Sequence, residues 1–180
     1  NNVLNAIKNK GNNIGSDSLK TRYTAECRFL RAFYYFQLVR LFGKVPLIER
    51  PMTASEVAKV SRTGVSEVYD SIESDLTYAI DSLPKSYTSS DIGRATSYAA
   101  EGLLGLVYLT KSGPTYGVDG PGLDSKEYDK AISLINDIIN SNMDSFLADY
   151  SAIFSYKNED NKEVIFDVKY MSSSKGASFP

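Results

Sequence analysis

The chain has 180 residues, 42% of them hydrophobic and 23% charged, a composition typical of a folded globular protein and not of a disordered one. Lys and Arg total 20 against 22 Asp and Glu, and this net charge of -2 argues against nucleic acid as a partner. The sequence has no His and one Cys, which excludes Ser-His-Asp and Cys-His catalysis, His-ligated zinc, multi-cysteine metal clusters and an internal disulfide.

The first strong element is a long helix predicted over residues 21–42, preceded by a short helical end near residues 3–7. Apolar side chains occur on most sides of the long helix, so we expect other elements to cover it. Gly43 stands where a left-handed C-cap is expected, and Pro46 prevents the helix from continuing. Arg28 and Arg31 of this helix are expected to brace it against its neighbours through their guanidinium groups.

The second predicted helix, residues 65–83, has the clearest amphipathic pattern of the chain. Its apolar positions recur at spacings of three and four: Val65, Val68, Tyr69, Ile72, Leu76, Ala79, Ile80 and Leu83. Leu76 lies at the centre of this stripe and is expected in the core. Pro84 ends the helix.

Two further helices and a strand are predicted downstream. Thr96 is a suitable N-cap for a third helix reaching Leu109, and the glycines within it, Gly102 and Gly105, indicate close approach of another backbone. Asp124 and Glu127 form a start similar to a capping box for a fourth helix that reaches Ile139. Alternation from residue 164 to residue 170 predicts a short β-strand near the C-terminus, whose partner strand must lie elsewhere.

These elements predict a mainly α fold of helical hairpins in which residues 1–180 form a single region. The serine-rich tail over residues 171–180 reads as a loop leading into further sequence, so we interpret the chain as a fragment of a longer protein.

Several acidic and glycine-rich motifs are candidates for phosphate, calcium or catalytic sites. Gly120, Gly122 and Ser125 imitate a phosphate loop only superficially, because Pro121 removes a backbone donor. Acidic loops are candidates for calcium binding, but turn and cap roles explain them better; they are Asp119 with Asp124 and Glu127, and the turn from Asn158 to Asn161. Carboxylate pairs are candidates for glycoside hydrolysis, but a solvated surface position explains them better; they are Glu73 with Asp75, and Glu159 with Asp160. We therefore predict no catalytic residue, no metal site and no cofactor.

The single cysteine and the aromatic residues are the other candidates for a functional role. Cys27 lacks a base or a second cysteine and is interpreted as a small helix-packing residue. Most of the 13 Tyr and 8 Phe must fill the core, but Tyr87, Tyr98 and Tyr116 lie in or beside polar loops, where an exposed ring could stack on a ligand. These three tyrosines are the candidate ligand-binding residues.

Several segments of the chain together carry a resemblance to a known family. The longest is Ala25-Glu26-Cys27-Arg28-Phe29-Leu30-Arg31-Ala32-Phe33-Tyr34-Tyr35-Phe36-Gln37-Leu38-Val39-Arg40-Leu41-Phe42-Gly43-Lys44-Val45-Pro46-Leu47. The others are Val68-Tyr69-Asp70, Leu83-Pro84, Gly93-Arg94-Ala95-Thr96, Val107-Tyr108-Leu109 and Glu163-Val164-Ile165-Phe166. In this order the segments resemble the SusD/RagB family of outer-membrane nutrient-binding lipoproteins. The opening Asn1-Asn2-Val3-Leu4 resembles the end of a preceding helix of that family.

The resemblance implies a tetratricopeptide-like helical superhelix, of which this chain is the N-terminal helical region. It also implies a non-enzymatic protein of the outer membrane that captures a nutrient, an oligosaccharide or in one branch a peptide, together with a SusC-like TonB-dependent transporter. The full-length parent would be lipid-anchored at the cell surface through a cysteine upstream of this segment, and Cys27 cannot be that anchor because it lies inside a helix. No glycan-contacting residue is carried over, since Trp is absent from the chain.

Two readings compete with this one. A tetratricopeptide-like adaptor that binds a peptide in its groove is the alternative, although its helices would pair at a repeat near 34 residues and the connectors here are unequal. A fragment of a glycoside hydrolase would need a positioned carboxylate pair, which the sequence does not present.

Overall fold

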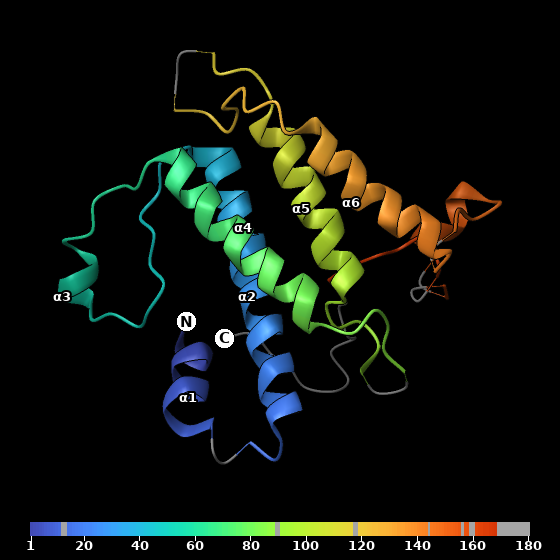
Figure 1. The fold of residues 1–180 in the computed structure, drawn as a ribbon, viewed down its shortest axis with the longest axis horizontal. Helices are drawn as coiled ribbons and strands as arrows, with labels where there is room; N and C mark the ends of the chain where they lie inside the picture. Colours follow the sequence, from blue (N-terminus) through green and yellow to red (C-terminus); the bar gives the residue numbers. More distant parts are fainter. Residues whose placement is uncertain are drawn as a thin grey trace.

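The computed structural model describes residues 1–11, 14–88, 91–116, 119–143, 145–155, 157–158 and 161–168, and most of these residues are helical (Figure 1). The α-helices are α1 (Asn2–Lys10), α2 (Asp17–Phe42), α3 (Ala54–Val57), α4 (Val65–Ser82), α5 (Ser97–Lys111) and α6 (Tyr128–Ser141). A short 3-10 helix spans Tyr150–Phe154. The mainly α class is confirmed. In the described part of the chain, no helix combines the length and the apolar character needed to cross a bilayer.

Helix α2 begins earlier than predicted and ends where predicted. Ser16 is its N-cap, and its hydroxyl accepts a hydrogen bond from the backbone N–H of Leu19 at 3.2 Å. At the other end the N–H of Gly43 donates to the carbonyl of Val39 at 2.9 Å. Gly43 has a φ of +64° as expected of a C-cap, but its ψ of -116° lies outside the left-handed helical region. A Cβ at this position would lie 1.6 Å from the carbonyl oxygen of Asp119, so only glycine fits.

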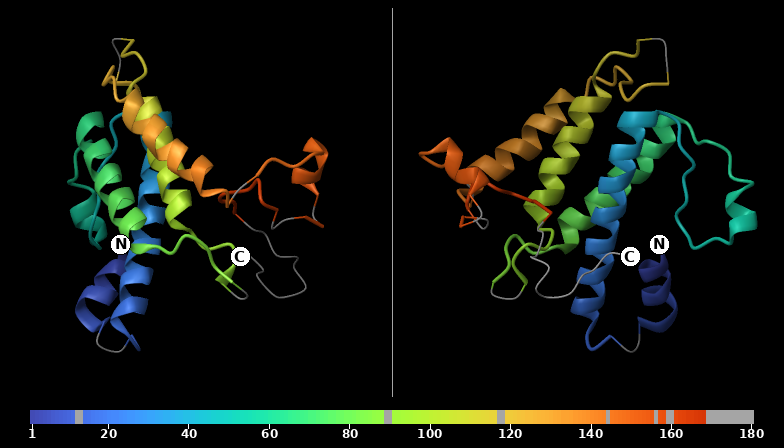
Figure 2. Two further views of the ribbon diagram at one scale, coloured as in Figure 1. Left: turned by 45° about the vertical axis from the view of Figure 1, so that its right-hand side comes forward. Right: turned by 180° about the vertical axis from the view of Figure 1, so that it is seen from behind.

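The helices pack in chain order. Helix α4 lies against α2, α5 against α4, and α6 against α5, while α1 covers the N-terminal half of α2 (Figures 1 and 2). Leu76 of α4 is fully buried, as its place in the stripe predicted. A Cβ on Gly105 of α5 would lie 3.4 Å from Cγ1 of Ile135 on α6, which confirms the expected close approach of a second helix. The result is a set of helical hairpins in successive layers.

The starts of α5 and α6 differ in how well the sequence predicted them. The hydroxyl of Thr96 accepts from the N–H of Ala99 at 3.1 Å, so the predicted N-cap of α5 is confirmed. Asp124 does not cap α6: its φ is +52°, the helix begins at Tyr128, and Glu127 is the N-cap without a side-chain capping bond. The N–H of Glu127 donates instead to Ser112 Oγ at 2.7 Å, since the connecting loop is tied to the end of α5.

The predicted C-terminal strand is not formed in the described residues. Residues 164–168 contain no strand, and residues 169–170 lie outside the described residues. The described part of the chain provides no neighbouring strand for this segment, and aromatic packing holds it instead: the Phe166 ring lies 4.9 Å from Phe29 and 6.1 Å from Phe33, centroid to centroid. Among the described residues, the β-contact is an isolated antiparallel bridge between Val45 and Thr63. Residues 46–62 lie between these two positions and carry α3, and we call this segment the arm.

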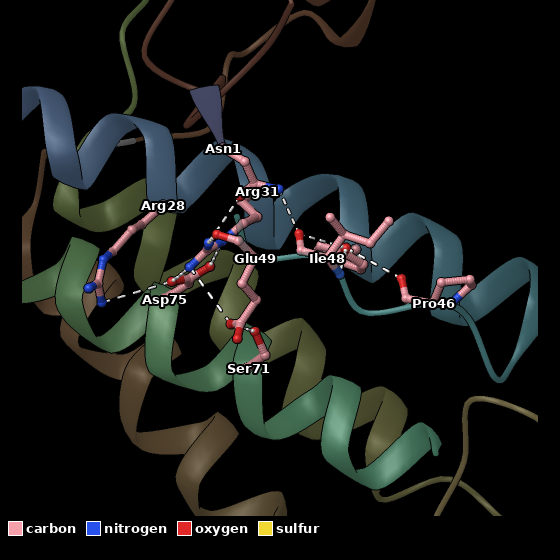
Figure 3. A network of polar contacts seen from close by, with 9 residues as sticks. Asn1, Arg28, Arg31, Pro46, Ile48, Glu49, Ser71 and Asp75 are labelled. Atoms are coloured by element: carbon pink, nitrogen blue, oxygen red, sulfur yellow. Dashed lines mark hydrogen bonds and ion pairs between the residues drawn. The ribbon is translucent and has the colours of Figure 1, made fainter. Parts of the chain in front are cut away.

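A polar network joins α2, α4 and the base of this arm (Figure 3). Arg31 Nε and Nη2 donate to the two carboxylate oxygens of Asp75 at 2.6 and 2.8 Å, and Arg31 Nη1 donates to the carbonyl of Glu49 at 3.2 Å. The hydroxyl of Tyr35 accepts from the N–H of Ile48 at 2.7 Å. The bond to Asp75 raises the pKa of the Arg31 guanidinium further, so Arg31 stays charged. These contacts agree with the bracing role expected of Arg31.

Candidate functional site

The three candidate tyrosines do not share one site. Tyr87 and Tyr98 line the same cavity of about 340 Å³, whereas Tyr116 lines a separate cavity of about 190 Å³ in the loop between α5 and α6. The side chain of Tyr116 is 84% exposed, as expected, and Tyr87 is half-buried. Tyr98 is only 7% exposed, so the expectation of an exposed ring was wrong there, because Tyr98 lies in the first turn of α5 and faces the helix packing.

We call the larger of these two spaces the Tyr87 cavity. Its walls are the loop from α4 to α5, the first turn of α5, and the segment from residue 161 to residue 167. Lys85 and Arg94 bring positive charge to it, with Lys85 Nζ 5.4 Å from the centroid of the Tyr98 ring. Asp167 is the single carboxylate among its described lining residues, so these residues supply no carboxylate pair of the kind that glycoside hydrolysis requires.

An ion network holds the loop that forms one wall of the Tyr87 cavity. Arg94 Nη1 donates to Glu26 Oε2 of α2 at 3.0 Å, and Arg94 Nε donates to Asp91 Oδ1 at 2.8 Å. Arg22 of α2 donates in turn to Asp91 Oδ2 at 3.1 Å. Two charges from α2 and two from the loop therefore alternate in sign, and they fix the loop against the long helix.

Tyr87 is positioned by the same network. Its hydroxyl donates to Glu26 Oε1 at 3.3 Å, and the Arg22 guanidinium lies 5.8 Å from its ring centroid. Burial, together with the negative charge of Glu26, raises the pKa of Tyr87 to about 12, so the phenol stays neutral at physiological pH. A neutral aromatic ring held by its hydroxyl at the edge of a cavity is suited to stacking, not to acid-base chemistry.

Glu73 and Asp75, one of the two candidate carboxylate pairs for hydrolysis, form structural ion pairs. Asp75 binds Arg31, and Glu73 accepts from Lys111 Nζ at 2.6 Å. The two side chains thus serve different neighbouring helices. Their interpretation as solvated residues of a helix face was wrong, because Asp75 is buried and Glu73 is half-buried, and each is paired with a cation of a packed helix. Glu159 and Asp160 lie outside the described residues.

The acidic residues of the loop before α6 are each paired with a lysine. Asp119 binds Lys44 at 2.9 Å and Asp124 binds Lys126. Glu127 accepts from both Lys111 and Lys130; although burial opposes its ionisation, these bonds and one from Ser125 lower its pKa to about 2. Within the described ranges, no group of three His, Cys, Asp or Glu side chains could hold a metal ion.

Gly122 and Cys27 also have structural surroundings. A Cβ on Gly122 would lie 2.4 Å from the carbonyl oxygen of Pro114, so close packing of the backbone of its own loop accounts for this glycine. Cys27 is half-buried on α2, and this burial raises the pKa of its thiol, which is opposite to the activation a nucleophile needs.

The sequence reasoning missed how the Tyr87 cavity is built. The alternating pattern predicts a strand at Phe166, and no local pattern gives Glu26 or Arg94 a place in a site. A signal was present at Gly93, whose φ of +93° turns the loop so that Arg94 reaches α2.

Comparison with known proteins gives one consistent family. Residues 1–109, more than half of the chain, match a SusD-like family described as "Starch-binding associating with outer membrane". A SusD-like protein of Bacteroides ovatus is 33% identical over 173 residues, which cover 95% of this chain and 30% of that protein. The SusD-like protein P2 of Formosa agariphila is 38% identical over 107 residues, covering 59% of this chain and 21% of the relative.

Solved structures agree with the sequence matches. A SusD-like carbohydrate-binding protein from Bacteroides fragilis superposes with a TM-score of 0.80 at 28% identity, covering 94% of this chain and 30% of that one. A laminarin-binding SusD-like protein gives a TM-score of 0.79 at 30% identity, with 92% and 34% covered. A structure containing a xylogluco-oligosaccharide gives 0.74 at 34% identity, with 92% and 31% covered. The chain thus spans about a third of the length of these relatives.

Proposed function

Because the chain belongs to the SusD-like family of starch-binding proteins that associate with the outer membrane, we propose that it forms the helical scaffold of a larger oligosaccharide-binding protein. In this proposal the protein captures a glycan for import and does not cleave it. The laminarin-binding relative and the structure with a xylogluco-oligosaccharide support a glycan as the ligand class.

The observation that carries the proposal is the Tyr87 cavity. Sugars present C–H faces that stack on aromatic rings and hydroxyl groups that bond to charged side chains. Tyr87 supplies a ring fixed by Glu26, while Lys85, Arg94 and Asp167 supply polar contacts around it. The Tyr87 cavity is open to solvent, so a bound glycan would need further contacts from other parts of the larger protein.

The partner and the location follow as parts of the same proposal. A lipid anchor upstream of this segment would hold the full-length protein at the cell surface, and a SusC-like TonB-dependent transporter would take the ligand from it. Stacked helix pairs give a stiff surface that suits docking on such a transporter.

Calorimetric titration tests the ligand. The full-length parent, titrated with laminarin and xyloglucan oligosaccharides, should bind at least one at micromolar concentration, and Tyr87→Ala should weaken that binding about ten-fold, since one stacked ring is worth about 1 to 1.5 kcal/mol. Tyr116→Ala is the matched control, because Tyr116 lines the other cavity and its loss should leave affinity unchanged. The 180-residue chain alone should bind only at millimolar concentration or weaker, about -4 kcal/mol.

Three results would count against the proposal. Release of reducing ends from any bound oligosaccharide would reveal an enzyme. Micromolar binding by the chain alone would show that the site is already complete. Parent protein that binds peptides and no glycan, and that fails to pull down a TonB-dependent transporter from solubilised outer membranes, would favour the peptide-binding adaptor.

A further inference from the structure

A cavity of about 420 Å³ lies on the other side of α2, between α1, α2 and the start of the arm. We call it the α1–α2 cavity. Its lining is strongly cationic, with side chains from all three elements: Lys8, Lys20, Arg28, Arg31 and Arg50. Glu49 is the one carboxylate among its described lining residues, so positive charge exceeds negative charge there.

Two of the five cations are already neutralised within the protein. Arg31 binds both oxygens of Asp75, and Arg50 Nη2 binds Glu56 Oε1 at 3.0 Å. The carboxylate of Glu49 accepts from the hydroxyl of Ser71 at 2.8 Å and approaches Arg31 only to 3.9 Å. These contacts account for the carboxylates near the cavity and leave none for the other cations.

The other three cations lack such partners. Lys8 and Lys20 form no ion pair with any residue of the described ranges. Arg28 reaches Asp75 only at 3.9 Å, and both oxygens of Asp75 already accept from Arg31. The Arg28 guanidinium lies 4.2 Å from the ring centroid of Tyr78, a contact with the ring face that leaves its N–H groups available as donors (Figure 3 shows Arg28 beside Asp75).

The placement of these groups favours an extended ligand over a single ion. Lys20 and Arg28 lie eight residues apart on α2, on nearby sides of the helix and about 12 Å apart along its axis. The end of the Lys20 side chain packs over Gly11 at the end of α1, so its ammonium group is held between the two helices. A chain with anionic groups at intervals can contact both cations at once.

We propose that the α1–α2 cavity binds the carboxylate or sulfate groups of an acidic oligosaccharide. Cations that lack a close carboxylate partner create a positive potential in the cavity, and an anionic ligand gains charge-assisted hydrogen bonds there. The saccharide part of this inference rests on the proposed function, while the anionic part rests on the cavity itself. The Tyr87 cavity on the far side of α2 is not involved.

Titration by NMR, which detects millimolar binding, tests the inference on the 180-residue chain. The probes are tetragalacturonate, galacturonate monomer and the neutral laminaritetraose. Tetragalacturonate should bind at least ten-fold more tightly than either of the other probes, and this preference should fall as salt increases. Lys20→Gln and Arg28→Gln should each weaken tetragalacturonate binding about ten-fold, since each removes one charge-assisted contact.

Lys59→Gln is the matched control, because Lys59 is an exposed lysine of the arm that does not line the cavity. If Arg28→Gln lowers the melting temperature, the loss of binding is judged from Lys8→Gln and Lys20→Gln instead, because Lys8 is exposed and Lys20 is half-exposed. Equal affinity for acidic and neutral probes, or an equal loss in Lys59→Gln, would overturn this inference and leave the proposed function standing. The 180-residue chain could still prefer tetragalacturonate in a salt-dependent way while the full-length parent binds no glycan in calorimetry. That result would support the anion site and overturn the proposed function.

Discussion

Replacing Asp75 with Ala tests the polar network between α2 and α4 most directly. The Asp75 side chain is 3% exposed and accepts two hydrogen bonds from Arg31, whose own side chain is 14% exposed. Asp75→Ala therefore leaves a largely desolvated guanidinium with only the Glu49 carboxylate, 3.9 Å away, as a counter-charge. Removing one partner of a buried pair costs about 3 to 5 kcal/mol.

The structure places the expected loss at the lower end of that range. Without Asp75, Arg31 still donates to the carbonyl of Glu49 at 3.2 Å and to Asn1 Oδ1 at 3.1 Å, so its guanidinium is not left wholly unsatisfied. We expect Asp75→Ala to lower the free energy of unfolding by about 3 kcal/mol. Asp75→Asn keeps the shape and one acceptor oxygen and should cost less, about 2 kcal/mol.

Urea unfolding followed by circular dichroism measures these losses, and a double-mutant cycle with Arg31→Met isolates the pair. Because the double variant removes both charges, it should lose less than the sum of the two single variants, with a coupling of about 2 kcal/mol. Additive losses, or a loss below about 1 kcal/mol in Asp75→Ala, would refute the conclusion that this pair braces the two helices.

Three further changes have expected outcomes. Leu76→Ala should cost about 2 to 5 kcal/mol in the same urea assay, because Leu76 is fully buried, and a loss under about 1 kcal/mol would contradict its central place in the core. Gly43→Ala should cost about 2 kcal/mol, since φ is positive and a Cβ would collide with the carbonyl of Asp119, whereas the control Gly15→Ala meets open space and should cost little. Burial raises the pKa of Glu101, which is 9% exposed and has an oxygen without a hydrogen-bond partner among the described residues. The folded chain therefore keeps this proton to higher pH than the unfolded chain does, and the stability of the wild type falls as pH rises through that interval. Glu101→Gln should be more stable than the wild type by about 1 kcal/mol at pH 7, and equally stable below the ordinary Glu pKa; no difference at pH 7 would contradict the buried charge.

Local sequence patterns determined most of the helical scaffold. The helical period of the apolar residues from Val65 to Leu83 was enough to predict α4. Thr96 predicted the start of α5, because an N-cap bonds to backbone within the first turn of its helix. Gly43 and Pro46 predicted the end of α2 for the same reason, as the signal lies in the residues next to it. Family membership also followed from the sequence, since its motifs lie on these helices in order.

Tertiary structure decided the features that depend on residues far apart in the chain. Arg31 meets Asp75 across 44 positions, and Tyr87 meets Glu26 across 61, distances over which helical periodicity carries no information. The alternating residues before position 170 have the period of a strand, but Phe166 packs on Phe29 of α2, and among the residues that the structure describes no second strand lies beside it. Tyr98 is buried for a similar reason: its position beside a polar loop suggested exposure, and the packing of α5 against its neighbours decided otherwise. Elements form from contacts within a turn or two, whereas cavities form where separate elements meet, so the helices could be read from the sequence and the two cavities could not.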